Sequence, residues 1–159
     1  ETIMAFDGSF LCSSFKNELL TATHDFSSHT IKLALYPSSA VGTAYGSSST
    51  IMDAGITAYQ TTNESSGTGY DAGGNALTVA STFPKLDGTA AVLDFNDLEF
   101  TGVTFSGSTA PRGAIIYNSS ASNKAIAVID FGEDKTVTSG TLTVSFPAGD
   151  STNAIIRIR

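Results

Sequence analysis

The sequence predicts a mainly β fold, an antiparallel β-sandwich or jelly-roll-like barrel with one N-terminal amphipathic helix. From residue 77 onward, β-branched and aromatic residues recur at every second position in short runs, which is the period of a strand. Turn-forming Gly, Asp, Asn and Ser residues separate these runs. Helical spacing of apolar residues is clearest near the start of the chain. The composition, 41 % hydrophobic and 14 % charged, is typical of a globular chain with a core.

The first expected element is a helix over residues 9–22. Its apolar residues follow helical spacing: Phe10, Leu11, Phe15, Leu19 and Ala22. Ser9 is placed to act as the N-cap, since its hydroxyl can accept a hydrogen bond from a free amide of the first turn. Lys16, Asn17 and Glu18 would then face solvent. We expect the apolar face of this helix to pack against a sheet, with docking to a partner as the alternative.

The remaining regular elements are expected to be strands. They cover residues 30–36, 77–83, 90–95, 98–105, 113–118, 125–131, 136–146 and 154–158. Pro37 ends the first of them, because proline has no amide hydrogen with which to extend a ladder. Residues 141–146 alternate most regularly, as expected for a half-buried strand. Sequential hairpins at this spacing favour a sandwich or barrel.

We expect one β-rich domain over residues 1–159, with a long Gly/Ser-rich loop or arm at about 37–76. A loop of that length inside a compact domain is usually functional, so we expect it to reach a neighbouring subunit. Tyr45, Tyr59 and Tyr70 are the candidate anchors of this partner interface, because a few aromatic side chains carry much of the binding energy of an interface. The alternative for each tyrosine is ordinary packing of the loop against the sandwich.

Charge and cysteine content exclude several classes of protein. The net charge is −7 and the pI about 4.5, so no nucleic-acid partner is expected. The basic residues are scattered apart from Arg157 and Arg159, which either dock on an acidic face or lie solvated. No apolar run approaches the roughly 18 residues of a membrane span, so no membrane partner is expected. No basic segment precedes a hydrophobic stretch, so no secretory signal is expected. The single cysteine, Cys12, rules out an intramolecular disulfide and is expected to be buried.

The segment GTGYDAGG at residues 67–74 shares only its glycine content with a phosphate-binding loop. Its spacing matches neither GxGxxG nor the P-loop, and no helix is expected after it. A sharp turn with positive φ at Gly69, Gly73 or Gly74 is the simpler interpretation.

Two polar clusters contain residue types that could bind a metal ion. Asp94, Asp97 and Glu99 supply the oxygen ligands that calcium prefers, but they alternate with apolar residues, so a solvated strand face with a bulge is simpler. His24 and His29 are expected to be ordinary turn residues, since zinc would need further ligands at suitable spacing. We therefore expect no cofactor, no metal and no catalytic residue. A glycan-active enzyme that uses the acidic cluster is the least favoured alternative.

Five short segments carry a resemblance to a known family. They are FKNELL at 15–20, THDF at 23–26, TNESSGTGY at 62–70, AVIDFG at 127–132 and TLTVSF at 141–146. Together, and in this order, they resemble a family of small tailed-bacteriophage virion structural proteins. The resemblance extends from the first helix to the last strands of the chain.

The resemblance implies a non-enzymatic virion protein. A capsid decoration or cement protein is favoured, because a small β-rich domain with an acidic surface and a long polar loop suits many copies across the seams of a shell. The implied partners are the major capsid protein or other virion proteins, together with copies of the chain itself, a trimer being favoured. The implied location is the virion, at the capsid surface, after synthesis in the bacterial host cytoplasm. The alternative is a tail, neck or head-fibre component, including an adhesion module that binds host glycan.

Overall fold

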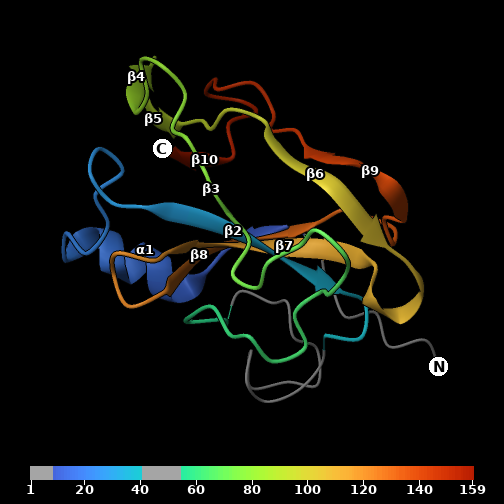
Figure 1. The fold of residues 1–159 in the computed structure, drawn as a ribbon. Helices are drawn as coiled ribbons and strands as arrows, with labels where there is room; N and C mark the ends of the chain where they lie inside the picture. Colours follow the sequence, from blue (N-terminus) through green and yellow to red (C-terminus); the bar gives the residue numbers. More distant parts are fainter. Residues whose placement is uncertain (1–8, 41–54) are drawn as a thin grey trace.

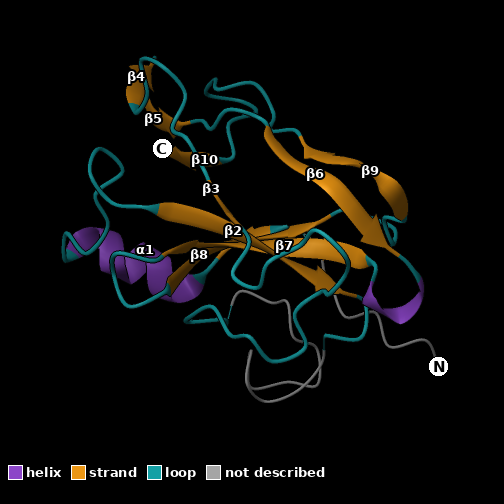
Figure 2. Cartoon of the chain, viewed as in Figure 1, coloured by secondary structure: helices purple, strands orange, loops and turns teal. Residues whose placement is uncertain are grey.

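The computed structural model describes residues 9–40 and 55–159, and the fold is mainly β with one short α-helix near the N-terminus, as predicted (Figures 1 and 2). The elements in chain order are β1 (Phe10–Leu11), α1 (Ser13–Leu20), β2 (Ile31–Pro37), β3 (Asn75–Ala76), β4 (Lys85–Asp87), β5 (Ala90–Leu93), β6 (Leu98–Phe105), a 3₁₀ turn (Gly107–Thr109), β7 (Pro111–Asn118), β8 (Lys124–Asp130), β9 (Val137–Val144) and β10 (Ile156–Ile158). Among the described residues, no helix has the length and apolar character needed to cross a membrane.

The strands form three antiparallel sheets. A five-stranded sheet has the order β1-β8-β7-β2-β3, with β2, β7 and β8 as its long central strands. A two-stranded sheet of β6 and β9 lies over this sheet, which gives a sandwich-like arrangement (Figure 1). A third sheet has the order β10-β5-β4, and its β10 contributes to a groove with α1. β6 pairs with β9, although β7 and β8 lie between them in the sequence. The chain therefore forms the β7–β8 hairpin of the five-stranded sheet between the two strands of the β6–β9 sheet.

The core lies between these layers and includes residues from all three sheets. Leu33 of β2 is fully buried, as is Cys12, which confirms the prediction for the cysteine. Phe105 of β6 and Leu93 of β5 belong to the same continuous apolar cluster. β2 and β7 are buried at almost every position because β6 and β9 cover one face of the sheet, whereas α1 and residues 55–64 lie on the other (Figure 1). Their nearly continuous apolar runs follow from burial on both faces.

The helix is shorter than predicted. α1 begins at Ser13, because two residues expected in its first turn pair with β8 as strand β1. Ser9 does not cap the helix; its hydroxyl accepts a hydrogen bond from the Asp130 amide at 3.0 Å. The expected polar face is also partly wrong, since Glu18 is only 8 % exposed whereas Leu20 is exposed. A short apolar run fits both periods, so its spacing alone does not separate a strand from a helical turn.

The predicted strand over 77–83 is wrong for most of its length. The segment lies between β3 and β4 and makes one isolated strand bridge, to Phe95. The Leu77 amide donates to a carbonyl of β2 at 2.8 Å, whereas the Ala80 amide donates to the carbonyl of Asp94 at 2.9 Å. The segment therefore passes from one sheet to the next, and neither neighbour runs beside it for long enough to form a regular ladder. The other predicted strands correspond to β2 and to β5 through β10.

Part of the predicted loop at 37–76 packs on the chain itself. Its residues 41–54 lie outside the described residues. In the remainder, the Ser65 amide donates to a carbonyl of β2 at 2.9 Å, and the Tyr59 amide donates to the Asn123 carbonyl at 2.9 Å. These bonds attach the described part of the loop to β2 and to the turn between β7 and β8. Its reach to a neighbouring subunit stays a prediction.

Candidate functional site

Two of the three candidate interface tyrosines meet at the carboxylate of Glu64. The Tyr59 hydroxyl donates to Oε2 at 2.7 Å, and the Tyr70 hydroxyl donates to Oε1 at 2.5 Å. The backbone amide of Gly73 donates to the same Oε1 at 2.8 Å. The third tyrosine, Tyr45, lies outside the described residues. Tyr59 and Tyr70 therefore have hydrogen-bond partners within the chain, in line with the alternative of loop packing against the sandwich.

Tyr117 of β7 completes this arrangement, which we call the Glu64 cluster. Its ring stacks on that of Tyr59 with centroids 4.4 Å apart, and its hydroxyl donates to the Gly73 carbonyl at 2.8 Å. Burial raises the pKa of Tyr117 to about 12. Burial, together with the neighbouring Glu64, raises the pKa of Tyr70 far above its ordinary range, so both phenols remain protonated donors. The cluster holds the loop against the sheet; a contribution of Tyr59 or Tyr70 to a partner interface stays a prediction.

The glycine segment forms the turns beside the Glu64 cluster. Its φ angle is +77° at Gly69, +93° at Gly73 and +64° at Gly74, which confirms the positive values predicted for a sharp turn. A Cβ atom at Gly74 would lie 1.8 Å from the carbonyl oxygen of Leu33 in β2. Only glycine allows the turn to approach the strand this closely. Strand β3, rather than a helix, follows the segment.

A second polar cluster joins His24 and His29 to three residues from other elements, and we call it the Glu18 cluster. Nδ2 of the fully buried Asn118 lies 3.1 Å from Nδ1 of His24 and 2.9 Å from Nδ1 of His29. Nε2 of His24 lies 2.8 Å from Oε2 of Glu18, whose Oε1 accepts a hydrogen bond from Lys124 Nζ at 2.7 Å. The cluster therefore connects α1 and the following turn to the ends of β7 and β8.

The chemistry of the Asn118 amide determines where the hydrogens of the Glu18 cluster lie. Nδ2 has two hydrogens and accepts none, so Nδ1 of each histidine is an acceptor, and His24 then carries its hydrogen on Nε2, where it donates to Glu18. Burial raises the pKa of Glu18, but hydrogen bonds from Lys124 and His24 outweigh burial and hold that pKa below its ordinary value. The Asn118 amide, His24 Nε2 and Lys124 Nζ each donate to an acceptor within the cluster, which suits a structural role.

Sequence analysis missed the Glu18 cluster because it treated both histidines as isolated turn residues. His24 is separated from Asn118 by 94 positions, and Glu18 is separated from Lys124 by 106. Only the pairing of β7 with β8 and with β2 brings the two halves together. The sequence signal for this contact was limited to one glutamate and two histidines within a short stretch.

The acidic residues Asp94, Asp97 and Glu99 do not form one site. β5 ends before Asp94 and β6 begins after Asp97, so a connection between two sheets interrupts the predicted bulged strand, and that part of the prediction is wrong. The expected solvent exposure is confirmed for Asp97 and Glu99. The Asp97 carboxylate accepts hydrogen bonds from the Ser145 hydroxyl at 2.9 Å and from the Phe146 amide at 3.1 Å. Across residues 9–40 and 55–159, no group of three or more His, Cys, Asp or Glu side chains is placed to hold a metal ion.

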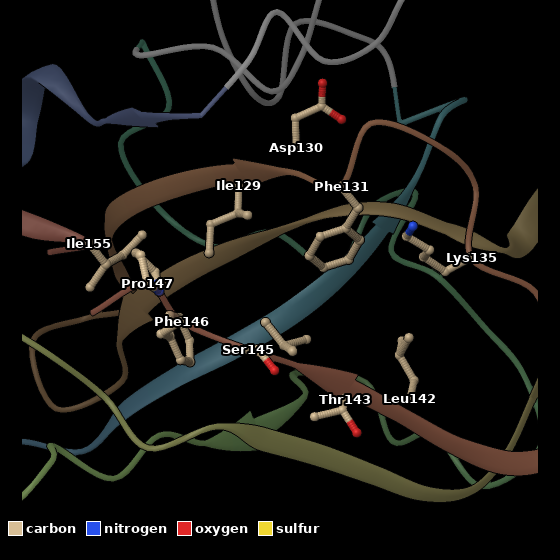
Figure 3. Close-up of a pocket in the computed structure, with 11 residues that line it drawn as sticks. Ile129, Asp130, Phe131, Lys135, Leu142, Thr143, Ser145, Phe146, Pro147 and Ile155 are labelled. Atoms are coloured by element: carbon tan, nitrogen blue, oxygen red, sulfur yellow. The ribbon is translucent and has the colours of Figure 1, made fainter. Parts of the chain in front are cut away.

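A groove of about 260 Å³ lies beside the end of β8 and along β9 (Figure 3). Its apolar lining consists of Ile129, Phe131, Leu142, Val144, Phe146, Pro147 and Ile155. Ile129 and Phe131 project to one side of β8, and Asp130 projects to the other, where its Oδ1 accepts a hydrogen bond from Arg112 Nε at 2.9 Å. Because strand alternation turns this carboxylate away, the groove is suited to apolar contact. We call it the β8–β9 groove.

The large hydrophobic side chains that are most exposed among the described residues gather on another face. Leu20 of α1 is 87 % exposed, Leu86 of β4 is 75 % exposed and Ile158 of β10 is 50 % exposed. Leu86 pairs with Ala91, and Ala91 pairs with Ile158, so these three side chains form one row across the β4–β5–β10 sheet. Leu20 and Ile158 line the same groove, which has a volume of about 350 Å³.

Basic side chains accompany these exposed hydrophobic residues. Lys16, Arg157 and Arg159 also line the groove that contains Leu20 and Ile158. We call the surface formed by the three basic side chains with Leu20, Leu86 and Ile158 the α1–β10 face. It combines a positive rim with apolar side chains on a chain whose net charge is −7. Such a surface is suited to docking on another macromolecule.

In comparisons with known proteins, no family model, no curated protein and no solved structure matched this chain. The resemblance to virion structural proteins therefore stays an expectation from the sequence segments.

Proposed function

We propose that this chain is a non-enzymatic structural protein of a tailed-bacteriophage virion, namely a capsid decoration or cement protein that stabilises the head shell. The sequence resemblance motivates the proposal. The α1–β10 face is the single structural observation that supports it, because a decoration protein must present a surface that adheres to a larger assembly.

The α1–β10 face has the composition of a docking surface. Large apolar side chains scattered singly over a surface need no explanation, but a group of them on one face marks an interaction site. Basic side chains at the rim would steer an acidic partner toward the face and oppose incorrect orientations. The Glu64 and Glu18 clusters tie the chain's own elements together, which favours a rigid unit suited to repeated docking on a shell.

Quantitative mass spectrometry of purified particles tests the proposal. The measured quantity is the ratio of this chain to the major capsid protein in particles of the phage that encodes it. A ratio near one to one, or one to a small number, would support a decoration protein. A ratio of a few per cent would instead place the chain at the neck, tail or a vertex, and its absence from particles would overturn the virion proposal.

The β8–β9 groove favours a second candidate, an adhesion module of a tail, neck or head-fibre component that binds host glycan. Phe131 and Phe146 present aromatic surface to the groove, and aromatic side chains can cover the apolar face of a sugar ring. A glycan array tests this candidate with the wild-type chain and with Phe131→Ser. Binding that the variant loses would support it, whereas no binding of the wild-type chain to host-surface glycans would contradict it.

A further inference from the structure

We propose that the α1–β10 face binds an extended segment of a partner virion polypeptide that carries large apolar and acidic side chains, and that this segment lies along the edge of β10. The inference rests on the proposed function, because the partner is taken to be another component of the particle. It goes beyond that function by naming the surface, the chemistry of the partner and the mode of recognition.

Several grooves lie side by side and form a trough along β10. A groove of about 250 Å³ beside β1 shares Leu11 and Arg157 with the 350 Å³ groove beside α1. That groove shares Leu19 and Ile158 with a smaller apolar cavity of about 110 Å³ between α1 and β5. Because neighbouring hollows share lining residues, they lie next to one another and together form a trough along β10. A trough of this kind accommodates an extended chain better than a compact small molecule.

The backbone of β10 is available to pair with a partner strand. The sheet order β10-β5-β4 places β10 at an edge, and within the described residues its ladder partner is β5 alone. An edge strand presents unpaired amide and carbonyl groups, which a partner strand can pair with. Alternate side chains of such a strand would then enter the trough beside Ile158. Backbone pairing provides affinity and the trough selects for apolar side chains.

The basic side chains of the α1–β10 face favour an acidic partner. Lys16, Arg157 and Arg159 are three of the eight basic residues in the chain, which also has fifteen acidic residues. The fifteen acidic residues of the chain outnumber the five remaining basic residues three to one. A partner segment that combines apolar side chains with Asp or Glu would match both parts of the α1–β10 face. A second copy of this acidic chain is the competing occupant, and the test separates the two.

Binding of the chain to particles from which it has been removed tests the inference. Arg157→Glu is compared with Lys135→Glu, which makes the same change in net charge at a side chain paired with Glu133 at 2.8 Å. We expect Arg157→Glu to weaken particle binding at least tenfold and Lys135→Glu to change it less than twofold. If the Arg157→Glu variant does not fold, Lys16→Glu provides a second charge reversal, at an exposed side chain of α1.

An apolar variant and hydrogen exchange provide independent measurements. Leu20→Ser combined with Ile158→Ser should also weaken binding at least tenfold, because the two substitutions remove apolar surface that the partner would cover. In the wild-type complex, the amides of β10 should exchange more slowly than in the free chain, as expected if a partner strand pairs with this edge.

The outcomes separate this inference from the proposed function. If the wild-type chain does not bind particles, the proposed function fails. If it binds, but the face variants bind equally well and β10 exchanges at an unchanged rate, this inference is overturned while the proposed function stands. If the face variants lose self-association in sedimentation experiments and keep particle binding, the face belongs to copies of this chain and the assignment to a partner segment is overturned.

Discussion

Glu64 shows at the scale of one residue how the described part of the long loop is held. Its carboxylate accepts hydrogen bonds from the hydroxyls of Tyr59 and Tyr70 and from the amide of Gly73. Hydrogen bonds to an ionised acceptor are stronger than those between neutral groups. Without this carboxylate, the two phenol hydroxyls and the amide would lose the acceptor that they share. The tyrosines are therefore coupled to one another through a residue that sequence analysis did not single out.

We predict that Glu64→Ala lowers the free energy of unfolding by about 2–4 kcal/mol, because three part-buried donors lose their common acceptor. Loss of an acceptor costs about 1–3 kcal/mol for a buried donor, and water restores part of this. Urea denaturation followed by circular dichroism measures the change. Glu133→Ala is the matched control, since the Glu133 side chain is 76 % exposed. We expect that control to change stability by less than about 0.5 kcal/mol. Equal losses in the two variants would contradict the role of Glu64.

Gly74 gives a second prediction at this scale, in comparison with Gly132. Both glycines have positive φ, +64° and +79°, but a Cβ at Gly74 would clash with a carbonyl of β2, whereas one at Gly132 would meet nothing within 4 Å. Gly132→Ala should cost only the left-handed strain of about 1–2 kcal/mol. We expect Gly74→Ala to lower the free energy of unfolding by at least about 2 kcal/mol more, because β2 or the turn must move. Similar losses in chemical denaturation would show that the turn relaxes freely.

At the scale of elements, α1 is attached by polar as well as apolar contacts. Phe15 is fully buried and belongs to the core. On the same helix, Glu18 bonds to Lys124 at the start of β8 and, through His24, to Asn118 at the end of β7. These contacts set the position of the helix on the sheet. They also leave Leu20 directed away from the core, where it becomes part of the α1–β10 face.

The Glu18 cluster predicts how stability depends on pH. The pKa of Glu18 in the folded protein lies below its ordinary value of 4.5, so the carboxyl binds a proton less readily when folded than when unfolded. Its contribution to stability is therefore complete above pH 4.5 and is lost as the pH falls through the lowered pKa. Hydrogen bonds from Ser27 and Ser28 hold the pKa of Asp25 at about 2, below its ordinary 3.8, which extends the loss toward pH 2.

The prediction is a fall in melting temperature between about pH 5 and pH 2, with a shallower slope in Glu18→Gln than in the wild-type chain. Calorimetry or circular dichroism at a series of pH values measures the slopes. Asp25→Asn is the companion variant, and its slope should differ from wild type mainly below about pH 4. If Glu18→Gln and the wild-type chain show the same slope, the carboxyl of Glu18 does not contribute to acid stability.

At the scale of the whole molecule, one apolar cluster connects the three sheets. Leu35 of the five-stranded sheet, Val103 of β6 and Ile156 of β10 all belong to it. A shared core of this kind couples the unfolding of its parts. The β4–β5–β10 sheet is joined to the rest through this cluster and through residues of the connection that follows β5.

We predict a single cooperative unfolding transition, with equal midpoints for circular dichroism and tyrosine fluorescence, because no sheet has a separate large core among the described residues. Urea titration with both probes measures the midpoints. Two separated transitions, above all an early one confined to the β4–β5–β10 sheet, would contradict a single β-rich domain over residues 1–159.

The local pattern of the sequence was sufficient for the fold class and for most strands. Alternation of period two arises wherever one face of a strand is buried, so it is readable without knowledge of the partner strand. Positive φ at Gly73 and Gly74 and the burial of Cys12 were predictable for the same reason, since each depends on residue type and near neighbours. Prediction failed at β1 and at 77–83, where the choice between structures depends on which strand lies alongside.

Sequence alone thus determined that this chain is mainly β and acidic, with one helix near its N-terminus, because periodicity and charge are properties of the chain itself. Only the tertiary structure decided that β6 pairs with β9, that Glu18 meets Asn118 through His24, and that Leu20, Leu86 and Ile158 share one face. These contacts join residues many positions apart. Their energies depend on strand order and register, which short-range patterns do not specify.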